Sequence, residues 1–282
     1  MSTRRDFIKT ASLGPLVVPE IEFGKKKVRL SGGEVILFQG DSITDARRKK
    51  DDKEPNSSPA LGVSYPFFAA GELLYRAPEK DFKIYNRAIS GNKVYQLADR
   101  WDVDCLDLKP TVLSILVGVN DFWHTLVNGY KGTVQTYRDD YKKLLDRTKK
   151  SLPSVKLVIG EPYAVKGVKA VDGRWYPGFP EYQQAAREIA DEYGAAFIPY
   201  QEVYDKAMKS APGSYWTADG VHPTMAGAKL MAEAWMKVVS FLLVLVFGVG
   251  IVRAQDGVHY SGTTISNVDY HHGRAGAGGG RA

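Results

Sequence analysis

The sequence predicts an α/β fold, a three-layer α/β/α sandwich with a central parallel sheet of about five strands. Short apolar runs rich in Val, Ile, Leu and Phe recur along the chain, as expected for strands buried on both faces. Segments with the apolar spacing of helices lie between them. Regular alternation of strand and helix is typical of a parallel sheet covered on both sides. We therefore expect one domain over residues 28–239.

Each expected strand is short, and three expected helices have a clear apolar face or a clear end. The strands are predicted at Val35–Phe38, Lys83–Tyr85, Val112–Val117, Lys156–Ile159 and Ala196–Ile198. The helices are predicted at Thr136–Lys150, at Glu181–Tyr193 before the stop signal Gly194, and at Thr224–Lys237.

The composition of the 282-residue chain is ordinary for a soluble globular protein. The net charge is +6, but residues 1–30 alone carry seven Lys or Arg against three Asp or Glu. No basic stripe interleaved with aromatic residues is present, so we expect no nucleic-acid partner. Cys105 is the only cysteine, which excludes an intramolecular disulfide and a thiolate metal cluster.

The N-terminal arm, residues 1–27, contains a possible export signal. The segment Ser2–Lys9 holds two adjacent arginines and resembles a twin-arginine signal, and the apolar stretch Ala11–Val18 follows it. Pro15 interrupts that stretch, and no clear cleavage site follows. We expect an exported protein, periplasmic or secreted. The alternative is an ordinary basic arm on a cytoplasmic protein.

The C-terminal segment, residues 240–282, does not fit the rest of the domain. Residues 238–252 form an apolar run between Lys237 and Arg253, shorter than the roughly 20 residues that span a membrane. We expect no stable membrane span, and the run resembles the core of a secretory signal. The remainder is rich in glycine. We expect this segment not to be native to the domain, the alternative being that its first residues extend the last helix into the core.

A candidate nucleophile follows the first predicted strand of the sheet. Ser42 lies in the sequence Gly40–Thr44, at the carboxyl end of a strand where α/β proteins place ligand chemistry. Taken alone, Gly-Asp-Ser is also a common turn. A serine nucleophile needs a base. Outside the C-terminal segment the chain has only two histidines, and His222 follows Asp219 by three residues. At that spacing the carboxylate can bind the Nδ1–H of the imidazole and leave Nε2 free to face the serine.

Two glycine- and asparagine-containing turns after the next strands offer donors for a developing oxyanion. Gly91 can present its backbone N–H, and Asn120 its side-chain amide. The loop Pro162–Pro180 is rich in aromatic residues and either stacks on a substrate or packs on itself. Asp41 and Asp121 beside these turns are expected chiefly to fix them. The full set of possible substrate-binding residues is Asp41, Asp121, His124, Tyr163, Trp175 and Trp216.

These ordered blocks resemble those of the SGNH/GDSL hydrolase family. The resemblance rests on Gly40–Thr44, Gly91, Gly118–Asp121 and the pair Asp219 and His222, and it spans most of residues 35–223. It implies a flavodoxin-like fold and no metal or organic cofactor. It further implies that Ser42 is the nucleophile and that His222 is the base, oriented by Asp219. The Ser42 N–H, the Gly91 N–H and the Asn120 side chain would form the oxyanion hole.

The function expected from the residues and the resemblance together is that of a serine esterase acting through an acyl-enzyme. Export and the aromatic loop favour an acetyl ester linked to a carbohydrate, either a small molecule or a polysaccharide. One alternative is a lysophospholipase- or thioesterase-like lipid hydrolase. Another is a non-catalytic binding module on the same fold. The sequence does not indicate the oligomeric state.

Overall fold

A computed structural model describes residue 21 and residues 23–241, so the possible export signal and residues 242–282 lie outside the described part. The described residues form a five-stranded, fully parallel sheet in the order β3-β2-β4-β5-β6. This order is that of flavodoxin-like folds, and the predicted number and direction of strands are confirmed. The strands are β2 (Val35–Gly40), β3 (Lys83–Asn86), β4 (Val112–Leu116), β5 (Lys156–Gly160) and β6 (Ala196–Ile198).

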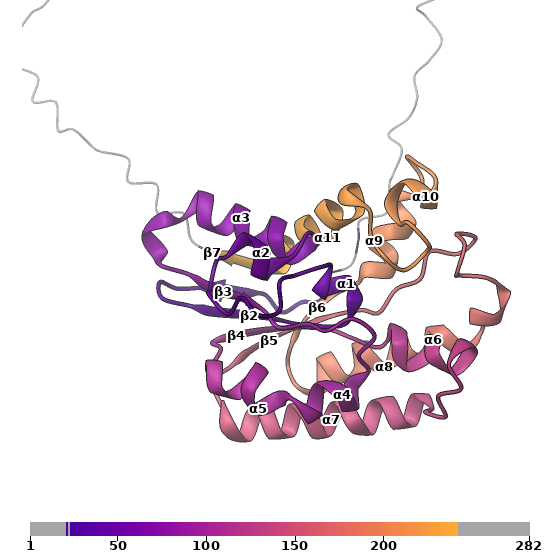
Figure 1. Ribbon diagram of the computed structural model, residues 1–282, viewed down its shortest axis with the longest axis horizontal. Helices are drawn as coiled ribbons and strands as arrows, with labels where there is room; N and C mark the ends of the chain where they lie inside the picture. The colour runs from indigo at the N-terminus through magenta and orange to yellow at the C-terminus, as the bar shows by residue number, and fades with distance from the viewer. Residues whose placement is uncertain (1–20, 22, 242–282) are drawn as a thin grey trace, which may run out of the picture. The chain divides into compact units, whose positions relative to one another are not determined.

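Helices cover both faces of the sheet, which makes three layers (Figure 1). α1 (Ser42–Asp45) begins directly after β2 at the carboxyl edge of the sheet. One outer layer contains α2 (Ser58–Leu61), α3 (Tyr65–Arg76), α9 (Tyr200–Ala207), α10 (Gly213–Trp216) and α11 (Met225–Val238). The other contains α4 (Val94–Asp99), α5 (Trp101–Asp104), α6 (Val119–Val127), α7 (Val134–Ser151) and α8 (Gly178–Glu192).

The ends of the domain contain a feature that the sequence analysis missed. β1 (Val28–Leu30) and β7 (Val239–Phe241) pair in parallel as a separate two-stranded sheet. The chain therefore leaves α11 at Val238 and continues as a strand, not as an extension of the helix. β7 ends at Phe241, two residues beyond the expected domain boundary at residue 239. Both strands alternate between apolar and polar residues, but three residues are too few for that alternation to be recognised in a sequence.

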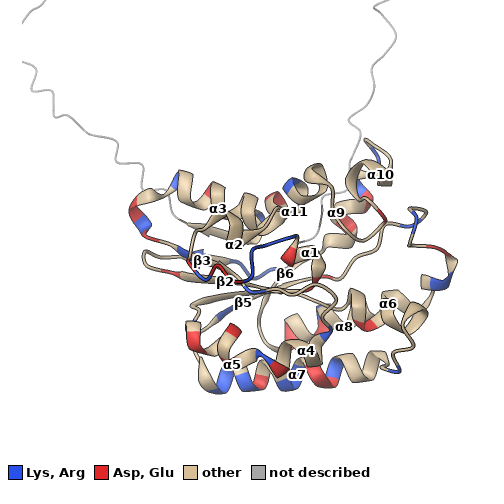
Figure 2. Cartoon of the chain, viewed as in Figure 1, with Lys and Arg blue, Asp and Glu red and all other residues tan. Residues whose placement is uncertain are grey.

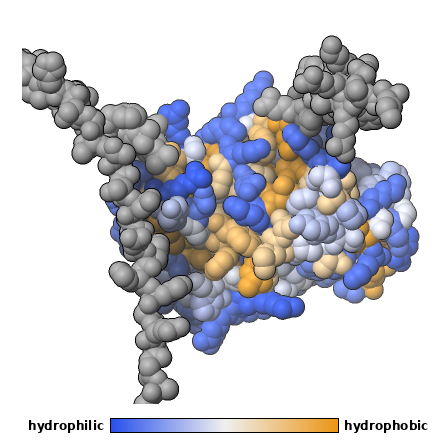
Figure 3. All heavy atoms as spheres, turned by 90° about the horizontal axis from the view of Figure 1, so that it is seen from above, coloured by the Kyte–Doolittle hydropathy of each residue, from blue (hydrophilic) through white to orange (hydrophobic). Residues whose placement is uncertain are grey.

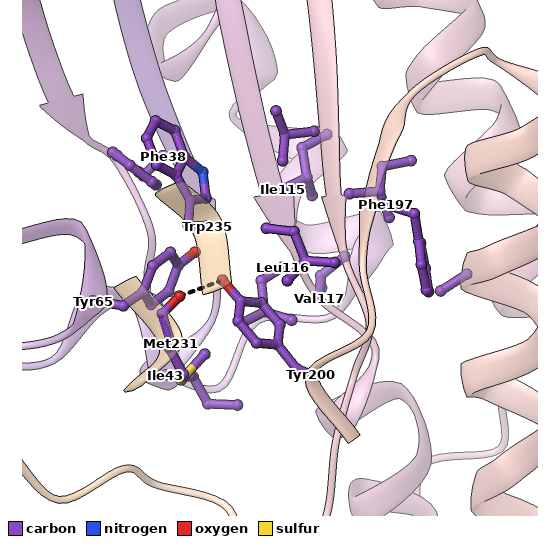
Figure 4. Close-up of a cluster of buried hydrophobic side chains, with 14 of the residues drawn as sticks. Phe38, Ile43, Tyr65, Ile115, Leu116, Val117, Phe197, Tyr200, Met231 and Trp235 are labelled. Carbon is purple, nitrogen blue, oxygen red and sulfur yellow. Dashed lines mark hydrogen bonds between the residues drawn. The ribbon is translucent and has the colours of Figure 1, made fainter. Parts of the chain in front are cut away.

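Aromatic side chains fill the space between the sheet and the layer of α3 and α11 (Figure 4). Phe38 of β2 packs against Tyr65 and Trp235, with ring centroids 5.6 and 5.2 Å apart. The indole of this cluster has a polar partner, since Trp235 Nε1 donates to Ser114 Oγ at 3.0 Å. Burying each such ring contributes about 1.5–3 kcal/mol relative to leaving it exposed.

The outer surface of the layer below the sheet carries charges of both signs, interspersed along α5 and α7 (Figure 2). Several of them pair between helices, as Lys142 of α7 does with Glu192 of α8 at 2.7 Å. Exposed pairs of this kind contribute only about 0–1 kcal/mol each.

Apolar side chains are visible on the opposite face, which α3 and α11 form (Figure 3). A cavity of about 420 Å³ hollows this face. Its lining includes Phe68, Met236 and Phe241, bordered by Glu72 and Lys237. None of the described helices is long and apolar enough to cross a membrane.

The carboxyl ends of β2, β3 and β4 meet at the point where the strand order changes direction, the usual place for a ligand site in such sheets. β2 approaches β4 very closely there. Gly40 has φ +155°, and a Cβ at this position would lie 2.2 Å from the Leu116 carbonyl oxygen. Only glycine fits, and the residues that follow, including Ser42, depend on this close contact for their position.

We expect Gly40→Ala to lower the free energy of unfolding by about 3 kcal/mol, because backbone atoms must separate to admit the methyl group. Gly71→Ala in α3 is the matched control, since a Cβ at that position would meet no atom within 4 Å. That substitution should stabilise the helix by about 0.5–1 kcal/mol. Urea unfolding of both variants checks this, and equal midpoints would contradict the assigned role of Gly40.

Candidate active site

Ser42, His222 and Asp219 form a continuous hydrogen-bonded array at the carboxyl edge of the sheet. Ser42 Oγ lies 2.8 Å from His222 Nε2, and His222 Nδ1 lies 2.7 Å from Asp219 Oδ2. Ser42 is the first residue of α1, whereas the other two precede α11. Serine and histidine are 180 residues apart in the chain, so only the fold brings them together. The expected use of the two ring nitrogens is the one observed.

The turn that carries Asp219 and His222 is held by its own backbone. Asp219 Oδ1 accepts hydrogen bonds from the N–H groups of Val221 and His222, at 2.9 and 2.8 Å. Gly220 has φ +97°, and a Cβ there would lie 2.7 Å from the Val168 carbonyl oxygen. The carboxylate therefore uses one oxygen to shape the turn and the other to orient the imidazole.

The charges in this array reinforce one another. Partial burial acts to raise the pKa of Asp219, but the hydrogen bonds from His222 and from two backbone N–H groups prevail and lower that pKa to about 2. The hydrogen bond to Asp219 in turn raises the pKa of the His222 imidazole, although burial opposes this. An ionised Asp219 thus stabilises the imidazolium that forms when His222 takes a proton.

The three residues predicted to bind an oxyanion follow β2, β3 and β4, adjacent parallel strands whose carboxyl ends lie at one edge of the sheet. Neither the Ser42 N–H nor the Gly91 N–H has an acceptor among the described residues. Gly91 has φ +80°, and the space where a side chain would stand is open. Asn120 donates one amide hydrogen to the Asn92 carbonyl at 3.2 Å and has the other free within the described part of the chain. This bond links Asn120 to the turn that contains Gly91, at the same edge of the sheet as Ser42.

Side chains that the sequence analysis did not single out hold these donors in place. Asp45 Oδ2 accepts from both the backbone N–H and the hydroxyl of Ser90, at 2.8 and 2.6 Å. Arg100 Nε donates to Asn92 Oδ1 at 2.9 Å. The residues on both sides of Gly91 are therefore held by side-chain hydrogen bonds, which fixes the turn that contains Gly91.

Asp41 and Asp121 lie beneath the site, not at its surface. Both are buried, Asp41 completely, and each accepts one backbone N–H, from Ile43 and Val94 respectively. Burial raises the pKa of each carboxyl to about 7. Their position supports the expectation that they fix turns and excludes direct substrate contact for Asp41.

The aromatic loop Pro162–Pro180 packs on itself and on the catalytic turn. Tyr163 and Trp175, expected as possible substrate-binding residues, are both fully buried, so that expectation is wrong for them. The Tyr163 hydroxyl donates to the Val221 carbonyl at 2.7 Å, and the Ala170 N–H donates to the Asp219 carbonyl at 2.9 Å. Sequence alone cannot show which side of such a loop faces inward. The loop serves to hold the acid–base turn.

Of the remaining candidates, Trp216 lies beside the turn of His222, since its carbonyl accepts the Thr224 N–H at 2.9 Å. Trp216 lines a separate cavity of about 350 Å³ with Phe23 and Leu230, which contains none of the three array residues. His124 lies on α6 one turn beyond Asn120 and is half-buried. Trp123, which was not predicted, lies with its ring centroid 6.3 Å from that of His222. Its place three residues after Asn120, on the same helical face, was the available signal.

We expect Asn120→Ala to lower kcat by about 10²–10³, because one preorganised oxyanion donor is lost. KM should change little, since the bond strengthens only as negative charge develops. Steady-state kinetics with 4-nitrophenyl acetate measure this. Asn128→Ala, an exposed asparagine after the same helix, is the control and should leave kcat unchanged. A similar loss in both variants would contradict the assignment.

A Ser–His–Asp array at the switch point of a three-layer parallel sheet is the arrangement of a serine hydrolase. No cluster of three or more metal-ligating side chains occurs among the described residues. The chain belongs to the GDSL-like lipase/acylhydrolase family, whose model matches residues 38–230, and it is a carboxylic ester hydrolase.

This chain matches similar proteins over nearly the whole of their length. It is 30% identical over 216 residues to an acetylxylan esterase from Geobacillus stearothermophilus, covering 76% of this chain and 97% of that one. A solved structure of that esterase matches with a TM-score of 0.66, at 28% identity over 74% of this chain and 95% of that chain. A structure described as a GDSL-like lipase from Parabacteroides merdae matches with a TM-score of 0.74, at 48% identity over 75% and 98% of the two chains.

Proposed function

We propose that this protein removes acetyl groups from carbohydrates, with Ser42 as nucleophile. The observation that carries the proposal is the 2.8 Å contact between Ser42 Oγ and His222 Nε2, completed by Asp219. The similarity to an acetylxylan esterase supports the choice of ester. Solved structures of catalytic mutants of that esterase replace a serine, an aspartate and a histidine by alanine, the same three residue types.

In the proposed reaction the Ser42 oxygen attacks the acetyl carbonyl while its proton moves to His222 Nε2. The carbonyl oxygen becomes an oxyanion that the N–H groups of Ser42, Gly91 and Asn120 stabilise. The bond to the sugar oxygen then breaks, and His222 gives its proton to that oxygen. Water, deprotonated by His222, attacks the acetyl-enzyme and releases acetate and the free serine.

The surroundings of His222 support a small acyl group. The Trp123 ring beside His222 is backed by Trp175, with centroids 5.7 Å apart, and Trp175 in turn packs on Phe122. Such a rigid aromatic wall leaves little freedom to open a channel for a long acyl chain.

A series of 4-nitrophenyl esters from acetate to octanoate, together with acetylated xylo-oligosaccharides, tests the proposed specificity. We expect kcat/KM to be highest for the acetate and to fall steadily with chain length. We also expect acetate release from the oligosaccharides. A preference for octanoate would instead indicate a lipid hydrolase, and the absence of turnover on every ester would indicate a binding module.

We also propose that the chain is exported, on the basis of the paired arginines and the apolar stretch near its start. Cell fractionation of the wild type and of a variant with both Arg4 and Arg5 replaced by Lys tests this. Equal distribution of the two would contradict it.

A further inference from the structure

Four side chains beside the oxyanion donors take no part in the proposed bond cleavage. They are Lys93, Tyr95, His124 and Tyr130, which we call the Lys93 cluster. Lys93 directly follows Asn92, whose carbonyl accepts the Asn120 amide. His124 lies four residues after Asn120, and therefore on the same face of α6 and about 6 Å further along its axis. The cluster thus borders the oxyanion hole.

Lys93 is a buried cation that pairs with no carboxylate of the described residues within 4.0 Å. The residue is 7% exposed. Its Nζ lies 5.5 and 5.1 Å from the ring centroids of Tyr95 and Tyr130. Contacts with aromatic faces partly offset the unfavourable burial of an ammonium group. The cluster therefore offers hydrogen-bond donors, and the carboxyl that acts on the pKa of Lys93, that of the buried Asp121, is not within 4.0 Å of it.

The contact between Lys93 and His124 fixes the tautomer of the histidine. Lys93 Nζ lies 3.1 Å from His124 Nδ1. An ammonium group can only donate, so Nδ1 must accept, and the proton of the neutral imidazole resides on Nε2. Burial, and secondarily the charge of Lys93, lower the pKa of His124, which favours the neutral ring. The half-buried His124 is thereby held as a fixed Nε2–H donor.

The two tyrosines are held in a defined arrangement. Their rings stack with centroids 6.1 Å apart and planes inclined by 25°. The Tyr130 N–H donates to the His124 carbonyl at 3.1 Å. Gly132 allows the Tyr130 ring to lie where it does, since a Cβ there would lie 2.3 Å from a ring carbon. Tyr95 is 39% exposed and offers both an apolar ring and a hydroxyl to a ligand.

We propose that the Lys93 cluster is a subsite for the sugar part of the substrate, in which His124 Nε2–H donates to a sugar oxygen and the exposed Tyr95 ring contacts the sugar. Lys93 acts as a positioning residue through His124. This inference rests on the proposed function and adds the residues that select a carbohydrate over a simple alcohol. A sugar oxygen accepts such a bond, and the apolar faces of a sugar ring suit an aromatic surface.

Binding measurements test the subsite without any turnover. Calorimetry with acetylated xylo-oligosaccharides would compare Ser42→Ala with the same protein also carrying His124→Ala. Loss of one hydrogen bond should weaken binding by about five- to tenfold. His124→Gln retains a donor and should lose less affinity. Lys93→Met removes the residue that positions His124. Its control is Lys131→Met, at an exposed neighbouring lysine, which should bind as the parent does. Unchanged affinity in the His124→Ala protein would overturn the proposal.

Kinetics and NMR separate a subsite from a general structural role. With His124→Ala we expect KM for the oligosaccharides to rise about five- to tenfold, and kcat/KM for 4-nitrophenyl acetate to stay within about twofold. Equal losses on both esters would overturn the proposal.

Nitrogen-15 shifts should show His124 protonated on Nε2 in the wild type and a mixture of tautomers in Lys93→Met. If the wild type cleaves neither ester, the proposed function fails, and calorimetry still decides on the subsite.

Discussion

Replacing Ser42 by alanine is expected to lower kcat for 4-nitrophenyl acetate by about 10⁶, to the level that oxyanion donors and binding alone provide. The physical reason is that Ser42 Oγ is the only atom in hydrogen-bond contact with His222 Nε2 among the described residues. Without it, no covalent acetyl-enzyme can form. The fold should be unaffected, because the Ser42 hydroxyl has no other partner among those residues.

A double variant tests whether Ser42 and His222 act as a unit or contribute independently to catalysis. Ser42→Ala combined with His222→Ala should be no slower than Ser42→Ala alone, because the residues act as a unit. Ser154→Ala, an exposed serine between α7 and β5, should retain full activity. Appreciable turnover by Ser42→Ala would show that another residue is the nucleophile, and additive losses in the double variant would show that Ser42 and His222 do not act as a unit.

The sheet could be predicted from the sequence because its strands are buried on both faces. The apolar run Val35–Phe38 is too short for a buried helix, and the structure extends the strand only to Gly40. Ser42, Gly91 and Asn120 then follow from topology, since parallel strands bring their carboxyl ends to one edge. His222 could be found by elimination, because so few histidines occur in the chain.

The errors concern side chains whose direction depends on packing. Tyr163 and Trp175 look like exposed loop aromatics in the sequence, yet both are buried and support the catalytic turn. Lys93 is the opposite case: a lysine after a turn is ordinarily exposed, and nothing local indicates its burial between two tyrosines. Composition and spacing identify which residues are available, whereas long-range contacts decide which of them face a ligand.

The pH dependence of the reaction should reflect the hydrogen bond between Asp219 and His222. His222 must be neutral to accept the serine proton, so kcat/KM falls as pH drops through the pKa of its imidazole. The bond to Asp219 raises that pKa above the ordinary value of 6.5, and the midpoint of the acid limb should therefore lie above pH 6.5. Asp219 itself stays ionised across this range, because its pKa is lowered to about 2.

Asp219→Asn should lower kcat by about 10⁴ and move the acid limb to lower pH. An asparagine amide at this position can donate to Nδ1, which places the ring proton on Nε2, where it can no longer accept from Ser42. The lost carboxylate charge also removes the stabilisation of the imidazolium, so the pKa of His222 falls. Asp107→Asn, at an exposed aspartate, should change neither quantity. A variant that lost activity while its acid limb stayed in place would show that Asp219 only shapes the turn through its bonds to the Val221 and His222 N–H groups.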